Sequence, residues 1–277
     1  MGIFAINHMT AANTSFAGLL AMAQACGCSG VELRNDLGSA LFDGDAPAAA
    51  ANMALQFELQ IFAVAQVESF NHLSVGTVEA VEKLATIAAA CGSAGIALIP
   101  ANNNTRTDQI IRRQDLLDAL RELVPLLEQH GICGFVEPLG FASASLRFKH
   151  EVVDAIEKLG ANHCIRLVHD TFHHVLAGER DCYPEHTGMV HVSGIINCDL
   201  SVDQMRDSHR VLVDARDRLR NVEQVSALQK GGYNGPVSME SFAPEVHQDS
   251  NLAEHLQASF QFISSGLATR VACNSMM

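Results

Sequence analysis

Short hydrophobic runs alternate along this chain with longer segments in which hydrophobic residues recur every three or four positions. The short runs are rich in Val, Ile and Phe, which is typical of strands buried in a parallel sheet. Their lengths, about five to eight residues, are also those of ordinary strands. We expect eight of them, at residues 3–8, 30–34, 60–67, 95–100, 132–138, 164–170, 189–193 and 236–241.

The longer segments have the periodicity of helices that cover a sheet. In 114–130, for example, Leu116, Leu120, Leu123 and Leu127 fall on one helical face. We expect further helices at 16–26, 47–57, 77–91, 150–159, 222–230 and 252–263, with a short unit after the sixth strand. Eight strands that alternate with helices predict an α/β fold, the (β/α)8 TIM barrel. No linker-like segment interrupts the pattern, so we expect a single domain over residues 1–277.

Composition and charge narrow the class of protein. The chain has 18 basic and 31 acidic residues and a formal net charge of −13, which disfavours nucleic acid as a partner. Although 48% of residues are hydrophobic, no run approaches the roughly 18 apolar residues that cross a membrane. The N-terminus lacks the pattern of a secretory signal, and the eight cysteines lack paired C-x-x-C spacing. We therefore expect a cytoplasmic protein with reduced thiols.

Ionisable residues stand at the ends of four consecutive strands: Glu137, Asp170, His191 and Glu240. In a barrel of this type the carboxyl ends of the strands meet at the face that carries the active site. Three carboxylates directed into one barrel mouth repel each other unless a cation neutralises them. An oxygen-rich set with one imidazole and no thiolate suits Mn²⁺, Mg²⁺, Co²⁺ or Zn²⁺. The pattern predicts one divalent metal ion bound by these four residues.

Four sequence motifs resemble the xylose-isomerase-like barrels, a family that includes ketose 3-epimerases, hydroxypyruvate isomerases, inosose isomerases and dehydratases, and apurinic endonucleases. The motifs occur in family order and are Phe-Val-Glu-Pro-Leu-Gly at 135–140, His-Asp-Thr-Phe-His-His at 169–174, Val-His-Val-Ser-Gly at 190–194, and Pro-Val-Ser-Met-Glu-Ser-Phe at 236–242. The stretches 206–213 and 243–245 further resemble the 2-keto-myo-inositol (inosose) isomerase branch of inositol catabolism.

The resemblance implies roles for further residues. It implies that His173 and Arg210 contact oxygen atoms of the substrate. The stretch 140–147 looks like the inosose isomerase branch and adds Arg147 as a further substrate contact. Glu137 and Glu240 are then the acid–base pair that moves a proton between adjacent carbons through a cis-enediolate. The implied substrate is a small keto-polyol, and relatives of this kind suggest a homodimer or homotetramer.

The same four ligands also support other reactions on the same barrel. Return of the proton to the same carbon is epimerisation, as in a ketose 3-epimerase, and loss of a hydroxyl is dehydration, as in an inosose dehydratase. Hydroxypyruvate isomerisation is a further alternative. An endonuclease-like hydrolase requires more metal ligands and a basic face, and a non-catalytic sugar-binding barrel predicts metal binding without turnover.

Overall fold

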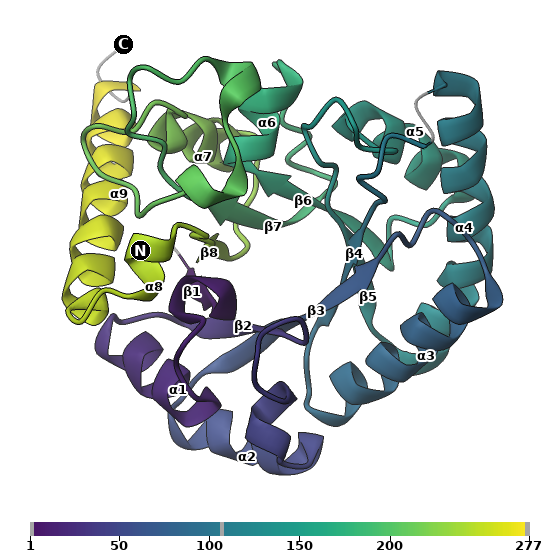
Figure 1. Ribbon diagram of the computed structural model, residues 1–277, viewed down its shortest axis with the longest axis horizontal. Helices are drawn as coiled ribbons and strands as arrows, with labels where there is room; N and C mark the ends of the chain where they lie inside the picture. Colours follow the sequence, from purple (N-terminus) through teal and green to yellow (C-terminus); the bar gives the residue numbers. More distant parts are fainter. Residues whose placement is uncertain (1–2, 106–107, 275–277) are drawn as a thin grey trace.

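The computed structural model describes residues 3–105 and 108–274, and its eight parallel strands form a closed barrel in sequence order (Figure 1). The predicted (β/α)8 fold is therefore confirmed. Each strand lies within two residues of its expected bounds. The strands are β1 (Phe4–Asn7), β2 (Gly30–Arg34), β3 (Gln60–Glu68), β4 (Gly95–Ile99), β5 (Cys133–Val136), β6 (Ile165–Asp170), β7 (Thr187–Val192) and β8 (Val237–Met239).

The helices surround the barrel on its outside (Figure 1). They bury a shared apolar core between themselves and the outward-facing residues of the strands. The helices are α1 (Phe16–Ala25), α2 (Pro47–Gln56), α3 (Val75–Ala90), α4 (Gln109–His130), α5 (Lys149–Leu159), α6 (Thr171–Ala177), α7 (Asn221–Lys230), α8 (Pro244–His247) and α9 (Leu252–Asn274). Short 3-10 helices occupy His8–Ala11, Leu41–Gly44, Val202–Gln204 and Asp207–His209.

Strand alternation assigns side chains to the inside or the outside of the barrel, because successive residues point to opposite faces. Phe135, Val168 and Met189 pack together in one buried cluster. Each precedes a site residue of its own strand by two positions, so it shares that residue's face. This apolar layer therefore lies beneath the polar groups and closes the barrel under them.

Two helices differ from their expected bounds by more than two residues. We expected α4 to begin at residue 114, but it begins at Gln109, because the Asp108 side chain caps it by accepting hydrogen bonds from the backbone N–H groups of Ile110 and Ile111. Both isoleucines are exposed, so the apolar stripe gives no sign of this first turn.

We expected the last helix to end at residue 263. Instead α9 continues to Asn274. A Cβ atom at Gly266 would lie 2.8 Å from Val222 Cγ1, so the glycine lets α9 run close against α7. Residues 275–277 lie outside the described residues.

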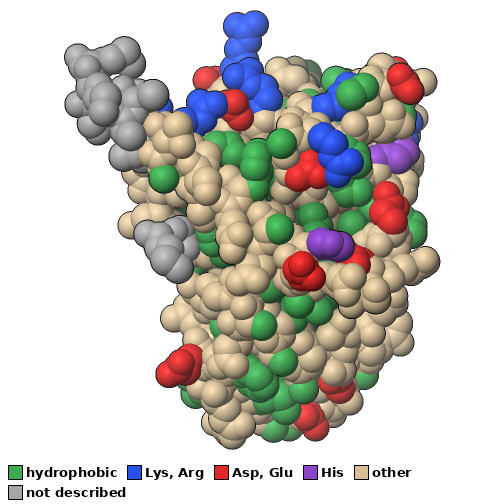
Figure 2. Space-filling view, turned by 90° about the vertical axis from the view of Figure 1, so that its left-hand side faces the viewer, with side chains coloured by type: hydrophobic (Ala, Val, Ile, Leu, Met, Phe, Trp, Pro, Cys, Tyr) green, Lys and Arg blue, Asp and Glu red, His purple; other side chains and the backbone are tan. Residues whose placement is uncertain are grey.

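The molecular surface agrees with the acidic composition. On the face that carries α9, lysine and arginine side chains gather at one end, and acidic side chains are spread over the rest (Figure 2). Among the described residues, no helix is both long and apolar enough to cross a membrane.

Candidate metal centre

Four side chains from neighbouring strands meet at one end of the barrel. Asp170 is the last residue of β6, His191 lies in β7, and Glu137 and Glu240 directly follow β5 and β8. All four side chains are buried. One potential ligand atom from each lies within 4.8 Å of the others. The structure therefore brings the four predicted residues together.

The surroundings of the His191 imidazole indicate whether these four residues can bind a metal ion. Its Nδ1 atom lies 3.4 Å from Glu137 Oε1 and 3.3 Å from Glu240 Oε2. This nitrogen is buried and finds no hydrogen-bond partner among the described residues. Buried polar atoms normally have a partner, so an unpaired nitrogen that faces carboxylates suggests a missing ion. Metal–ligand bonds of about 2.0–2.2 Å can join these atoms after small side-chain movements. The residues fit a divalent cation.

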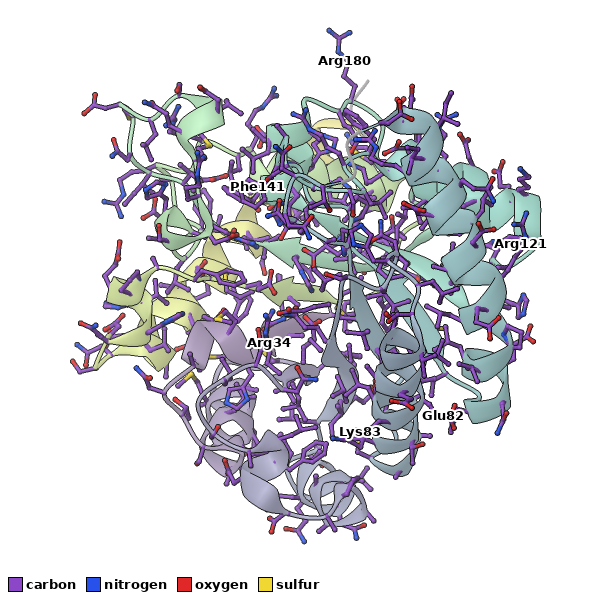
Figure 3. All side chains as sticks on the ribbon, turned by 45° about the vertical axis from the view of Figure 1, so that its right-hand side comes forward. Arg34, Glu82, Lys83, Arg121, Phe141 and Arg180 are labelled. Carbon is purple, nitrogen blue, oxygen red and sulfur yellow. The ribbon has the colours of Figure 1, made fainter. Side chains whose placement is uncertain are left out.

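Two arginines and an asparagine fix the carboxylate of Glu240. Arg34 Nη1 and Asn7 Nδ2 donate to its Oε1 at 2.9 and 3.2 Å, and Arg210 Nη2 donates to its Oε2 at 3.0 Å. Figure 3 places Arg34 toward the middle of the barrel. Because both oxygens are held, this carboxylate has one defined orientation.

Asp170 is fixed with equal firmness by its place between β6 and α6. Its Oδ1 accepts hydrogen bonds from the backbone N–H groups of Phe172 and His173, at 2.7 and 3.0 Å, and so caps α6. Its Oδ2 accepts from Arg210 Nη2 at 2.5 Å. Burial alone would raise the pKa of this carboxyl, but the Arg210 guanidinium outweighs burial and holds the pKa below its ordinary value.

The pKa values of the other ionisable groups of the site are shifted in opposite directions. Burial alone would lower the pKa of His191, but the carboxylates of Glu32 and Glu240 outweigh burial and raise it well above the ordinary value. Burial raises the pKa of Glu137. The pKa of Glu240 falls well below its usual range because His191 and Arg210 outweigh the effect of burial. Without a metal, positive charge on His191 is favoured, and a cation at Nδ1 would replace that proton.

The three predicted substrate contacts lie at different places. His173 is buried on α6, its Nδ1 has no hydrogen-bond partner among the described residues, and its ring centroid lies 5.3 Å from that of Phe141. Arg210 is buried between Asp170 and Glu240, as an ion-pair partner of two predicted ligands.

Arg147 lies in the loop after β5, two residues before α5. Its guanidinium donates to the backbone oxygens of Gly140 and Leu176, at 2.9 and 3.1 Å. It also lines a cavity of about 790 Å³ together with Phe141 and Asn102. The structure therefore gives Arg147 a bracing role between the loop after β5 and helix α6, beside a cavity that is large enough for a small polyol.

Two charged residues of the site, Glu32 and Arg34, were not predicted from the sequence. Both lie on β2. Val31 precedes Glu32, and Leu33 lies between Glu32 and Arg34. Both are buried in the apolar core between the strands and the helices. Alternation therefore directs Glu32 and Arg34 to the barrel interior. Two charged residues at alternate positions of a buried strand are unusual, and that signal was available in the sequence.

A family model for xylose isomerase-like TIM barrels matches residues 20–265, and the chain therefore belongs to this family. The expected resemblance is confirmed at this level. A comparison with curated proteins finds no match.

Solved structures similar to this chain include a xylose isomerase domain-containing protein from Salmonella typhimurium LT2, with 27% identity and a TM-score of 0.86, over 96% of this chain and 97% of that one. The IolI protein with a bound zinc atom has 16% identity and a TM-score of 0.84, over 96% and 98% of the two chains. D-psicose 3-epimerase from Clostridium cellulolyticum H10, solved with D-tagatose, has 15% identity and a TM-score of 0.75, over 95% and 99%. The last two likenesses establish a shared fold.

Proposed function

We propose that this protein is a divalent-metal-dependent isomerase of a keto-polyol, with 2-keto-myo-inositol as the substrate to test first. The observation that carries the proposal is the buried group of Glu137, Asp170, His191 and Glu240, in which His191 Nδ1 has no hydrogen-bond partner among the described residues. The fold shared with a zinc-containing IolI protein and with a ketose 3-epimerase supports the same class of chemistry.

A divalent cation held by the four residues supplies a Lewis acid that stabilises the negative charge on an α-hydroxyketone when a carbon-bound proton leaves. The protein supplies the acid–base groups. Glu137 and Glu240 directly follow β5 and β8, and both side chains face His191 Nδ1. One removes the proton from the hydroxyl-bearing carbon, and the other delivers a proton to the former carbonyl carbon, while the hydroxyl proton passes to the former carbonyl oxygen. The result is movement of the ketone by one position.

His173 and Arg147 are proposed to orient the substrate. The His173 ring packs edge-on against Phe141 and keeps one buried nitrogen unpaired, so it can bond a substrate hydroxyl. Arg147 borders the adjacent cavity. Arg210 is proposed to hold the carboxylates of Asp170 and Glu240 in the orientation in which they would bind a metal ion.

The test is proton exchange in D₂O. Protein freed of metal is reloaded with Mn²⁺ and incubated with 2-keto-myo-inositol, and the products are analysed by NMR after protein and metal are removed. Metal-dependent deuterium incorporation together with a displaced ketone supports the isomerase. Incorporation with inverted configuration and an unmoved ketone indicates an epimerase, and loss of water indicates a dehydratase. A metal-loaded protein that incorporates no deuterium contradicts the proposed substrate.

A further inference from the structure

A fourth carboxylate, on Glu32, lies against the site without joining the predicted ligands. Glu32 is on β2, and its Oε2 lies 3.1 Å from His191 Nε2. Glu32 is only 1% exposed and His191 only 2%. The second carboxylate oxygen, Oε1, has no hydrogen-bond partner among the described residues. Among the described residues, the side chain of Glu32 therefore has one hydrogen bond, the bond to His191.

The hydrogen bond determines which ring nitrogen of His191 can bind a metal. A neutral imidazole has one N–H donor and one acceptor nitrogen, and an ionised carboxylate can only accept. The proton of the neutral ring must therefore lie on Nε2, where Glu32 accepts it. The lone pair is left on Nδ1, the atom that faces Glu137 and Glu240.

We propose that Glu32 is a positioning residue of the metal centre, which fixes the tautomer and the ring orientation of His191 and increases its basicity as a ligand. This inference rests on the proposed metal centre. Burial of a carboxylate with one unpaired oxygen is unfavourable. An apolar residue would fill the same space in the barrel at lower cost, so packing does not account for a charge at this position.

Loss of a carboxylate behind a metal-bound histidine typically lowers metal affinity by about 10- to 100-fold. We expect Glu32→Gln to weaken Zn²⁺ binding by about tenfold, because the amide oxygen still accepts the Nε2 proton but carries no charge. We expect Glu32→Ala to weaken it by about 100-fold. The graded response distinguishes positioning from a purely structural role, since the glutamine has the same shape as the glutamate.

The chain contains a matched control pair. Glu82 Oε1, on α3, lies 2.9 Å from His130 Nε2, on α4. This carboxylate–imidazole contact is of the same kind as that between Glu32 and His191. Figure 3 shows Glu82 away from the barrel interior. Glu82→Gln therefore makes the same chemical change at a histidine outside the proposed site, and it is expected to leave Zn²⁺ affinity within twofold of the wild-type value.

The experiment measures Zn²⁺ affinity by competition with a chromophoric chelator, in the absence of any substrate. Thermal melts of each variant confirm folding. If Glu32→Gln and Glu32→Ala weaken binding in that order and Glu82→Gln does not, Glu32 positions the ligand. If the wild-type protein binds Zn²⁺ and the folded Glu32→Gln variant binds it equally well, the assignment of Glu32 is wrong, and the spectra of His191 then decide whether the metal centre stands. If the wild-type protein binds no Zn²⁺, both are wrong.

A second readout follows His191 itself. Long-range ¹H–¹⁵N correlation spectra of the Zn²⁺-loaded protein, labelled with ¹⁵N in its histidines, identify the nitrogen that carries the proton. We expect a metal-bound Nδ1 and a protonated Nε2, with a proton resonance that shifts upfield in Glu32→Gln. Metal binding through Nε2 in the wild-type protein would overturn the assignment.

Discussion

Arg210 Nη2 lies 2.5 Å from Asp170 Oδ2 and 3.0 Å from Glu240 Oε2, so one buried guanidinium joins two of the predicted metal ligands. Its Cζ atom also lies 4.9 Å from the Phe172 ring centroid and 4.7 Å from that of Phe242. The arginine thus supplies positive charge to a crowded group of carboxylates. In the metal-free protein, this charge offsets part of their mutual repulsion.

Replacement of Arg210 is expected to destabilise the metal-free protein more than the metal-loaded protein. Arg210→Met leaves Asp170 buried without its guanidinium partner and leaves Glu240 with the guanidinium of Arg34 alone. Loss of one partner of a buried ion pair typically costs about 3–5 kcal/mol. A bound divalent ion would neutralise the same carboxylates and reduce the loss. Urea unfolding with and without Zn²⁺ measures both values. Arg216→Met, at an exposed pair with Asp214, is the control and should change little. An equal loss with and without Zn²⁺ contradicts this account.

Glu240→Gln is expected to weaken metal binding and to lower kcat by about 10²- to 10⁴-fold, the range typical of a lost acid–base group. The amide keeps the shape of the side chain, so the barrel should still fold. Metal titration and steady-state kinetics with 2-keto-myo-inositol measure the two effects. Glu245→Gln, at an exposed glutamate five residues further on, serves as the control. A fully active Glu240→Gln protein is incompatible with the proposed role.

Acid stability is expected to depend on His174, which lies behind the site with its Nδ1 2.7 Å from Lys149 Nζ. Burial and this lysine lower the pKa of His174 from 6.5 to about 3. The unfolded chain therefore takes up the proton first as pH falls. The stability contribution is complete above pH 6.5 and is lost toward pH 3, with a slope of about 1.4 kcal/mol per pH unit for one proton.

His174→Asn should flatten that slope, because the asparagine side chain does not titrate. The measurement is the free energy of unfolding in urea at pH 7, 6, 5 and 4. His163→Asn makes the same substitution at a histidine side chain that is 58% exposed, and it is the control for the substitution itself. Identical slopes in the wild-type protein and His174→Asn would refute the assignment of this acid sensitivity to His174.

Gly140 is expected to be intolerant of a side chain because α6 packs against it. An added Cβ would lie 2.3 Å from the backbone oxygen of His173 and 2.6 Å from Leu176 Cβ. Gly140→Ala must therefore displace the helix that carries His173, at a cost of about 1–3 kcal/mol. Urea unfolding and the KM for substrate report the two consequences. Gly38→Ala, whose added Cβ meets nothing within 4 Å, is the control, and equal stability of the two variants counts against the packing argument.

Much of the fold could be predicted because a parallel barrel has a simple sequence pattern. Buried strands such as 30–34 appear as short apolar runs, and the helices between them show helical periodicity. The rule that strand ends meet at one face then brings Glu137, Asp170, His191 and Glu240 into one group. The structure places one potential ligand atom from each of these residues within 4.8 Å of the others.

The remaining features depend on contacts between distant segments. Glu32 contacts His191 across 159 positions of sequence, and Arg34 contacts Glu240 across 206. Alternation on β2 can indicate that Glu32 and Arg34 share a face, but barrel closure determines which groups they meet. The first turn of α4 was missed for another reason: its stability comes from the Asp108 cap, which apolar periodicity does not detect.

The most direct test of the metal centre is a crystal structure of the Zn²⁺-loaded protein with anomalous diffraction recorded at the zinc edge. We expect one strong peak among Glu137, Asp170, His191 and Glu240, with His191 Nδ1 and the carboxylate oxygens at about 2.0–2.2 Å from the ion. A second group, Glu128, His163 and Cys164, also has potential ligand atoms within 4.8 Å of one another. A zinc peak at that group alone, or no peak at the four buried residues, would contradict the central claim.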